Sequence, residues 1–165
     1  MLPITELLGW LESTQLAIYV SQSPSVFPAL EMVHVTATTL IVGMIAIVDL
    51  RLIGIGAKSS AITDIYRDVI PLTWGAFVVA AITGGLLFIS QAVQYSANIG
   101  VRMKFSLLAL IAVNMLVFRW IIYPGISKWD RDTPVPFAAK LAGAISLISW
   151  ISVVAAARWI AYLML

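Results

Sequence analysis

The sequence predicts an all-α integral membrane protein, an up-down four-helix bundle with an N-terminal amphipathic interfacial helix. Composition is the first reason: 61% of the 165 residues are hydrophobic and 11% are charged, whereas soluble proteins carry about a quarter charged residues. The second reason is that the apolar residues form four runs of roughly 20 residues, enough to cross a hydrocarbon core of about 30 Å as helices. Together these runs fill most of the chain, so we expect one transmembrane domain over residues 1–165.

Residues 1–24 predict a helix that lies along the membrane surface. Ile4, Leu7, Leu8 and Leu11 recur at helical spacing, and polar residues lie between them. This is the pattern of an amphipathic interfacial helix. Pro24, in a serine-rich stretch, is expected to end it.

The apolar runs then define four membrane spans, expected at residues 27–48, 71–93, 105–123 and 138–163. Short connections favour antiparallel packing of consecutive helices. Small residues inside the spans allow helix backbones to approach closely; they are Gly43, Gly84, Gly85, Ala139 and Gly143.

The orientation follows from the lysines and arginines, which are enriched in short cytoplasmic loops. Seven of the ten lie in or beside the loops after the first and third spans, namely Arg51, Lys58, Arg67, Arg119, Lys128, Arg131 and Lys140. We therefore expect a multi-pass protein of the bacterial cytoplasmic (inner) membrane, with both termini in the periplasm.

Several classes of chemistry are excluded by what the sequence lacks. It has no cysteine, which rules out a disulfide, a thiolate metal site and covalently attached c-type haem. The basic residues form no patch of the kind that binds nucleic acid. Because there is also no P-loop, HExxH or GxSxG motif, we do not expect the chain to catalyse a reaction on its own.

A carboxylate and the only histidine share one face of the first span. Glu31 and His34 are three residues apart, so they project from the same side of a helix. Ionisable groups inside a membrane are costly and usually face a bundle interior or an aqueous cavity. Lys104 and Arg158 are expected at the same depth, and Arg158 is expected to pair with Glu31 or to extend to the lipid headgroups. These residues predict a polar pocket in the outer leaflet.

The role of this pocket has several interpretations. The charged residues could simply hold helices together, or the pocket could bind a ligand or cofactor, or His34 and Glu31 could transfer protons. Met103 lies near the level of His34, so a copper(I) site or a b-type haem ligated by His34 and Met103 is chemically possible.

Other polar residues lie deeper in the spans or near their ends. Asn114 and the series Ser146, Ser149 and Ser152 predict hydrogen bonds between helices. Near the cytoplasmic end we expect an interfacial charge network of Asp49, Arg51, Arg67, Asp68 and Arg119.

The strings FPALEMVHVTATTLIVGMIAIVDLRLIG and RMKFSLLALIAVNMLVFRW resemble an uncharacterised family of small four-span bacterial inner-membrane proteins. The family pattern is FPxxExxH, then glycine, then DLRLxG, then lysine, asparagine and phenylalanine on the third helix. The matching positions are Phe27, Pro28, Glu31, His34, Gly43, Asp49, Leu50, Arg51, Leu52, Gly54, Lys104, Asn114 and Phe118. The chain is more loosely similar to copper-resistance D proteins and cytochrome b561-like membrane anchors.

From the sequence we therefore expect a non-catalytic membrane subunit or anchor. It would act with a redox or periplasmic partner, or as a homo-oligomer, through the outer-leaflet pocket of Glu31, His34, Met103, Lys104 and Arg158. One alternative is a carrier of b-type haem or copper, with His34 as the ligand. A second is a pathway for a small solute or for protons.

Overall fold

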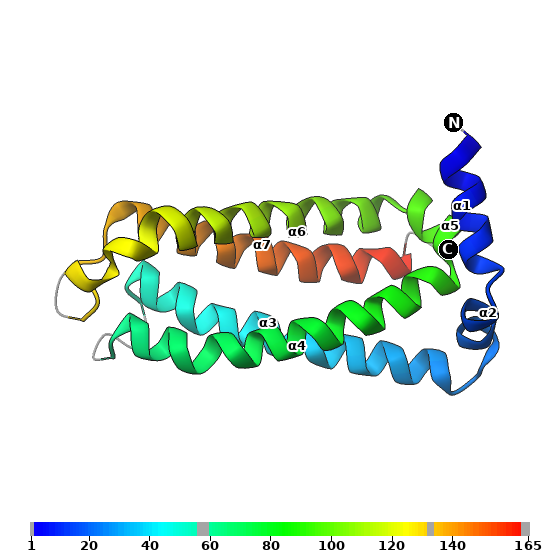
Figure 1. Ribbon diagram of the computed structural model, residues 1–165, viewed down its shortest axis with the longest axis horizontal. Coiled ribbons are helices and arrows are strands. Elements are labelled where there is room, and N and C mark those ends of the chain that lie inside the picture. The colour runs from blue at the N-terminus through cyan, green and yellow to red at the C-terminus, as the bar shows by residue number, and fades with distance from the viewer. Residues whose placement is uncertain (1, 56–59, 132–133, 163–165) are drawn as a thin grey trace.

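The computed structural model describes residues 2–55, 60–131 and 134–162, and the described chain contains helices and no strands (Figure 1). Four of these helices are long and apolar enough to cross a membrane. The helices are α1 (Leu2–Glu12), α2 (Gln15–Gln22), α3 (Val26–Ile53), α4 (Ile62–Ser90), α5 (Ala92–Ala97), α6 (Ile99–Val117) and α7 (Phe137–Tyr162). A π-helical segment, Phe118–Ile122, and a 3₁₀ segment, Tyr123–Lys128, extend the third span.

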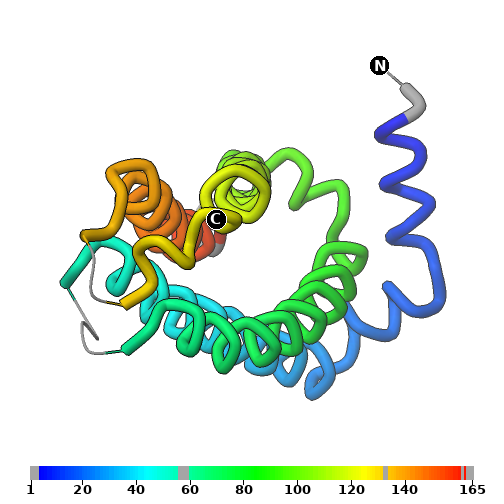
Figure 2. The backbone as a smooth tube through the Cα atoms, turned by 60° about the vertical axis from the view of Figure 1, so that its left-hand side comes forward, coloured from blue at the N-terminus to red at the C-terminus, as the bar shows by residue number. Residues whose placement is uncertain are grey.

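The four long helices run antiparallel in sequence order. α3 packs against both α4 and α7, and α6 packs against α7, whereas α4 and α6 are not among the closely packed pairs of the described residues. Figure 2 shows α3 and α4 side by side, and α6 and α7 as a second pair. We call the end where α3 begins and α7 finishes the α1 end, and the opposite end, which carries Arg51 and Arg67, the basic end.

The N-terminal segment forms two helices instead of the single helix expected over residues 1–24. The helix breaks at Ser13 and Thr14, and the Thr14 side chain accepts a hydrogen bond from the amide of Ala17 in the first turn of α2. Threonine in this capping position favours a new helix start. α1 lies across the end of the bundle and projects beyond it (Figure 1), and the Glu12 carboxylate accepts a hydrogen bond of 2.8 Å from the amide of Val93.

The long helices continue past the predicted apolar runs. α4 begins at Ile62, nine residues before the start of the predicted span at residue 71. The helix extends this far because Asp64, Arg67 and Asp68 occupy its first turns without interrupting it. Helix geometry tolerates charges that reach water at the end of a span. The third span changes geometry before its end, since Pro124 lacks the amide that would bond to the carbonyl of Trp120.

Two of the four glycines named from the sequence lie at close contacts between helices. A Cβ atom at Gly143 would lie 3.0 Å from the Cβ of Leu52 and 3.1 Å from the carbonyl oxygen of Asp49, so α7 crosses α3 at this point. At Gly84 a Cβ atom would meet the ring of His34. Gly43 and Gly85, which the sequence also placed at close approaches, have open space where a Cβ would be.

The basic end is held together by hydrogen bonds to backbone. The Arg51 side chain is buried, and its guanidinium donates to the carbonyls of Ser60, Asp130 and Arg131 at 3.1 to 3.4 Å. The Asp130 carboxylate accepts from the amide and the hydroxyl of Thr63, at 2.9 and 2.6 Å. The loop before α7 therefore caps the start of α4. Lys58, which contributed to the predicted orientation, lies outside the described residues.

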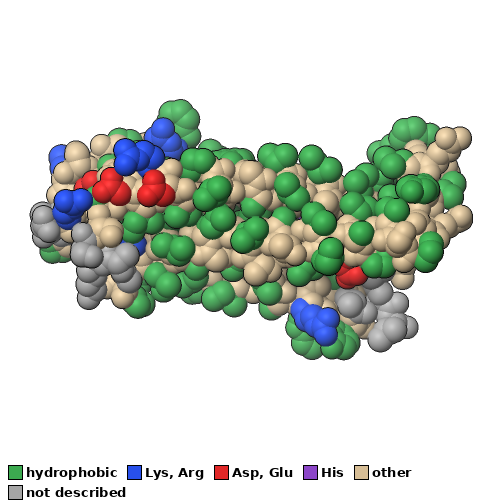
Figure 3. All heavy atoms as spheres, turned by 90° about the horizontal axis from the view of Figure 1, so that it is seen from below, with side chains coloured by type: hydrophobic (Ala, Val, Ile, Leu, Met, Phe, Trp, Pro, Cys, Tyr) green, Lys and Arg blue, Asp and Glu red, His purple; other side chains and the backbone are tan. Residues whose placement is uncertain are grey.

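The middle of the bundle presents an apolar surface, and charged side chains gather toward its ends (Figure 3). Large exposed apolar side chains occur on all four long helices, for example Leu40, Leu72, Leu110 and Ile148. In water such a surface would be unfavourable, whereas in a bilayer it contacts acyl chains. The fold is that of a multi-pass membrane protein.

Candidate functional site

His34 lies half-buried on α3, where its ring is fixed by α4. Its Nδ1 is 2.9 Å from the carbonyl oxygen of Ala80 and 3.2 Å from the hydroxyl of Thr83. A carbonyl oxygen can only accept, so Nδ1 carries the hydrogen and donates it. The other ring nitrogen, Nε2, faces the ammonium of Lys104, which can only donate, so Nε2 is the acceptor and the imidazole is neutral.

That acceptor faces Lys104 on α6. The Lys104 Nζ lies 3.3 Å from His34 Nε2, and the ammonium donates to the ring nitrogen. The side chain of Lys104 is half-buried, and the ion pairs of the described residues, Asp64 with Arg67 and with Arg131, do not include it. The structure thus joins three helices through one chain of polar contacts, from Ala80 through His34 to Lys104.

Gly84 makes room for this arrangement. A Cβ atom at position 84 would lie 2.7 Å from Cε1 of His34, closer than real Cβ contacts come, and 3.1 Å from Nδ1. The buried hydroxyl of Thr83 also donates to the carbonyl of Val79 at 2.7 Å, which fixes its orientation beside the ring. The sequence suggested close packing at Gly84 but not that an imidazole fills the space.

The other predicted site residues lie around this contact without joining it. Glu31 is exposed. The pKa of Tyr95 is raised, first because Tyr95 is partly buried and second because the negative charge of Glu31 lies near it. Arg158 is also exposed, and it lies over the ring of Tyr162, with its guanidinium carbon 5.3 Å from the ring centroid. The structure therefore does not bring Arg158 to Glu31. Arg158 extends along its own helix, as it would to reach headgroups.

Met103 takes a different direction from its neighbour Lys104. It is 54% exposed and lines a groove between α6 and α7, together with Arg102 and Trp159. In the described residues no group of three or more histidine, cysteine, aspartate or glutamate side chains is placed to hold a metal ion. For His34 to bind a metal or haem iron through Nε2, Lys104 would have to leave that nitrogen.

A second polar position was misassigned from the sequence. Asp49, expected in an interfacial charge network, is instead 4% exposed, and the hydroxyl of Ser146 on α7 hydrogen-bonds to its carboxylate. Its other oxygen, Oδ2, has no hydrogen-bond partner in the described structure. Arg51 bonds to loop carbonyls rather than to Asp49, and Arg119 lies over the ring of Tyr123. The prediction that Asp49 belongs to an interfacial charge network is therefore wrong.

A sequence signal for this burial exists. Ile41, Ile45, Val48 and Leu52 recur at helical spacing on α3 and face the interior, and Asp49 lies on the same stripe, four residues after Ile45.

By contrast, the expected role of Asn114 is confirmed, because its side-chain amide donates to the carbonyl of Ala142 on α7 at 2.9 Å.

Comparison of the chain with protein-family models, with curated proteins and with solved structures finds no match. The function is therefore inferred from the contact between the half-buried side chains of His34 and Lys104 and from its surroundings.

Proposed function

We propose that the protein is a non-catalytic membrane subunit or anchor, which engages a redox or periplasmic partner through the polar site of His34 and Lys104. The observation that carries this proposal is the contact between Lys104 Nζ and His34 Nε2. An ammonium carries three N–H donors, and His34 is its hydrogen-bond partner among the described contacts. The remaining donors can bind a carbonyl or carboxylate oxygen from a partner or from a quinone headgroup.

The surroundings of the pair support binding rather than catalysis. The imidazole is fixed on one side by a backbone carbonyl and on the other by a cation, so it has no free nitrogen to act as a base. A rigid ring that positions a half-buried ammonium is, however, well suited to hold an electronegative group in a low-dielectric environment.

Co-purification tests the proposal. The wild-type chain, Lys104→Met and Lys140→Met would be purified under mild detergent conditions from native membranes. Lys140 is an exposed lysine at the basic end, so it is the matched control. We expect a stoichiometric partner with the wild type and with Lys140→Met, and its loss with Lys104→Met. A wild-type chain that purifies alone, or a partner that stays with Lys104→Met, would refute the proposal. The mass of the complex distinguishes a second copy of this chain from a different protein.

A haem carrier is the second candidate, and one observation favours it. Histidines that ligate metals commonly donate their other ring N–H to a carbonyl, as His34 does to Ala80. The visible absorption spectrum of protein purified from its native membrane decides the question. A Soret band that is lost in His34→Ala would support this candidate, and a colourless protein that retains its partner would support the anchor.

For the orientation we propose that the basic end faces the cytoplasm, with the α1 end and the His34 site on the periplasmic side of the inner membrane. The supporting observation is that Arg51, Arg67, Lys128 and Arg131 lie at or beside the end of α3, the start of α4 and the end of the third span, which meet at one end of the bundle. A reporter that is active only in the cytoplasm should be active when it is fused within the loop between α3 and α4, and a reporter that is active only in the periplasm should be inactive there. A periplasmic signal would reverse the assignment.

A further inference from the structure

A cavity of about 310 Å³ lies between the four long helices in the basic half of the bundle. This is the lower end of the volume range of small-molecule sites. Along α3, Asp49 is 15 residues from His34, which is about 22 Å at 1.5 Å per residue. Neither His34 nor Lys104 is among the lining residues, so the carboxyl group of Asp49 belongs to a site separate from the contact between His34 and Lys104.

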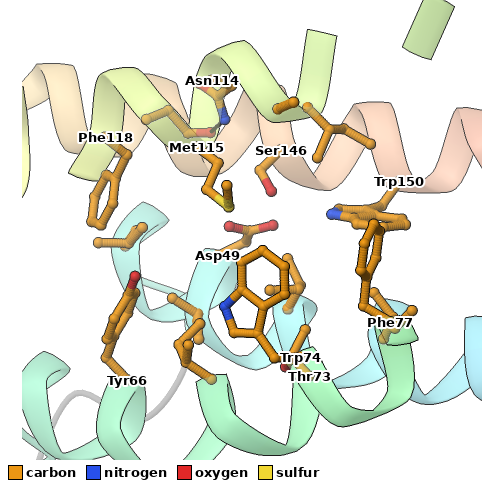
Figure 4. Close-up of a pocket in the computed structure, with 18 of the residues that line it drawn as sticks. Asp49, Tyr66, Thr73, Trp74, Phe77, Asn114, Met115, Phe118, Ser146 and Trp150 are labelled. Atoms are coloured by element: carbon orange, nitrogen blue, oxygen red, sulfur yellow. Dashed lines mark hydrogen bonds between the residues drawn. The ribbon is translucent and has the colours of Figure 1, made fainter. Parts of the chain in front are cut away.

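Five aromatic rings line the cavity, and they come from three of the four spans. The rings are those of Tyr66, Trp74, Phe77, Phe118 and Trp150. Figure 4 shows the carboxyl group of Asp49 pointing toward Ser146, with the rings of Trp74, Phe77 and Trp150 around the same space. Aliphatic side chains such as Ile45 and Leu108 complete the walls.

The cavity reaches the lipid-facing surface on the side where α4 and α6 lie apart. Trp74 and Phe77 on α4 and Met115 on α6 line it, yet they are 51%, 42% and 43% exposed. Only 6% of the apolar window of the third span is buried, so that span covers little of the interior. A molecule dissolved in the bilayer can therefore enter from the side.

The cavity is lined by one carboxyl group and by no basic side chain among the described residues. Asp49 is almost fully buried, and its Oδ2 lacks a partner, whereas no lysine or arginine is among the lining residues described. A buried carboxylate without a counter-charge is unfavourable, and an opposite charge close to it relieves that cost. Aromatic faces also attract cations, most strongly when water is excluded.

We propose that this cavity binds an apolar organic monocation, such as an aromatic amine or a quaternary ammonium compound, drawn from the membrane. Asp49 supplies the counter-charge, Ser146 holds the carboxylate in place, and the rings of Trp74, Phe77 and Trp150 contact the apolar body of the ligand. The occupant is selected by its charge and by its solubility in lipid, because the entrance faces acyl chains. This inference involves neither His34 nor Lys104, and its failure would leave the proposed function unaffected.

Equilibrium dialysis of the detergent-purified full chain against benzyltrimethylammonium tests the proposal, in mildly alkaline buffer so that the carboxyl is ionised. The uncharged isostere 2,2-dimethylpropylbenzene is measured in parallel, and both are corrected for uptake by empty micelles. We expect the cation to bind the wild-type protein at least tenfold more tightly than the isostere does. Equal or weaker binding of the cation would overturn the proposal and indicate a cavity for neutral apolar molecules such as lipid chains.

Asp49→Asn then tests the residue itself, because asparagine keeps the shape and can still accept from Ser146. Asp68→Asn is the matched control, since Asp68 is exposed on α4 outside the cavity. We expect at least a tenfold loss of cation binding in Asp49→Asn, none in Asp68→Asn, and unchanged binding of the isostere. Cation binding that survives in Asp49→Asn would refute the role of the carboxylate. If Asp49→Asn fails to fold, the comparison of cation and isostere on the wild type decides the proposal alone.

Discussion

His34 occupies a hollow that exists because residue 84 has no side chain. Its Cε1 would lie 2.7 Å from a Cβ atom placed at Gly84, and its Nδ1 reaches the carbonyl of Ala80 one turn earlier on α4. The position of the imidazole therefore depends on Gly84 of the facing helix α4 as well as on the backbone of α3, which carries His34.

Gly84→Ala should displace the imidazole. Alanine normally stabilises a helix interior by up to about 1 kcal/mol over glycine, but here overpacking should reverse the sign and destabilise the protein by about 1–3 kcal/mol. Gly85→Ala, which has open space at its Cβ, is the control and should be neutral or stabilising. Thermal unfolding in detergent measures both, and ¹⁵N chemical shifts of His34 should report loss of the Nδ1–H hydrogen bond. Equal stability of the two variants would contradict this prediction.

The crossing of α3 and α7 should be similarly intolerant of a methyl group. At Gly143→Ala the new Cβ would meet the backbone oxygen of Asp49 at 3.1 Å, and backbone yields less readily than a side chain. We expect a loss of about 1–3 kcal/mol, whereas Gly43→Ala, with nothing within 4 Å, should lose none. The measurement is again the midpoint of thermal unfolding. If Gly143→Ala were as stable as Gly43→Ala, the helices would not cross as closely as described.

Arg51 should be sensitive even to a conservative replacement. Its guanidinium donates to three carbonyls through two different nitrogens, a geometry that one ammonium cannot reproduce. Arg51→Lys should therefore destabilise the protein by about 1–3 kcal/mol. Arg67→Lys alters an exposed ion pair with Asp64 and should change stability by less than about 0.5 kcal/mol. Indistinguishable unfolding of the two variants would show that Arg51 is not held by the loop.

Acid should weaken the cap that Asp130 provides for α4. Burial tends to raise the pKa of Asp130, but hydrogen bonds from the hydroxyl and amide of Thr63 and from the amide of Ile62, together with the positive charge of Arg131, outweigh it, so the pKa lies below its ordinary value. The ionised cap therefore stabilises the fold fully above about pH 4 and loses this contribution as the pH falls through the lower folded-state pKa.

Asp130→Asn is the variant that tests this cap. At neutral pH it should be less stable than the wild type by about 1 kcal/mol, and the difference should narrow on acidification below about pH 4. Unfolding temperatures across a pH series measure it, with the exposed Asp68→Asn as control. A difference that is independent of pH throughout the acid range would show that the carboxylate charge contributes nothing.

The four spans were predictable because hydropathy depends on composition over many residues, and neighbouring helices hardly alter it. The ends of the spans were less predictable. α4 starts well before its apolar run, because Asp64 and Arg67 are helical while their side chains extend toward water. The break at Thr14 depends on one capping hydrogen bond, which apolar periodicity does not reveal.

The sequence predicted the level of the site residues along the bundle but not the direction in which each side chain points. Sequence position places His34 and Lys104 at one level of the bundle, and the structure joins them. It cannot tell which way each side chain turns, so Arg158 and Met103, equally near in depth, lie on other faces. Asp49 was misread because the charged residues near it in the sequence suggested an interfacial network, although the side chains of Asp49 and Arg51 are both buried and have different partners.

The sideways projection of α1 gives the molecule a wider cross-section at one end than at the other (Figure 1). Ile4, Leu7 and Trp10 are exposed on this arm, so the apolar surface of the bundle continues sideways onto α1 at this end and has no counterpart of that kind among the described residues of the basic end.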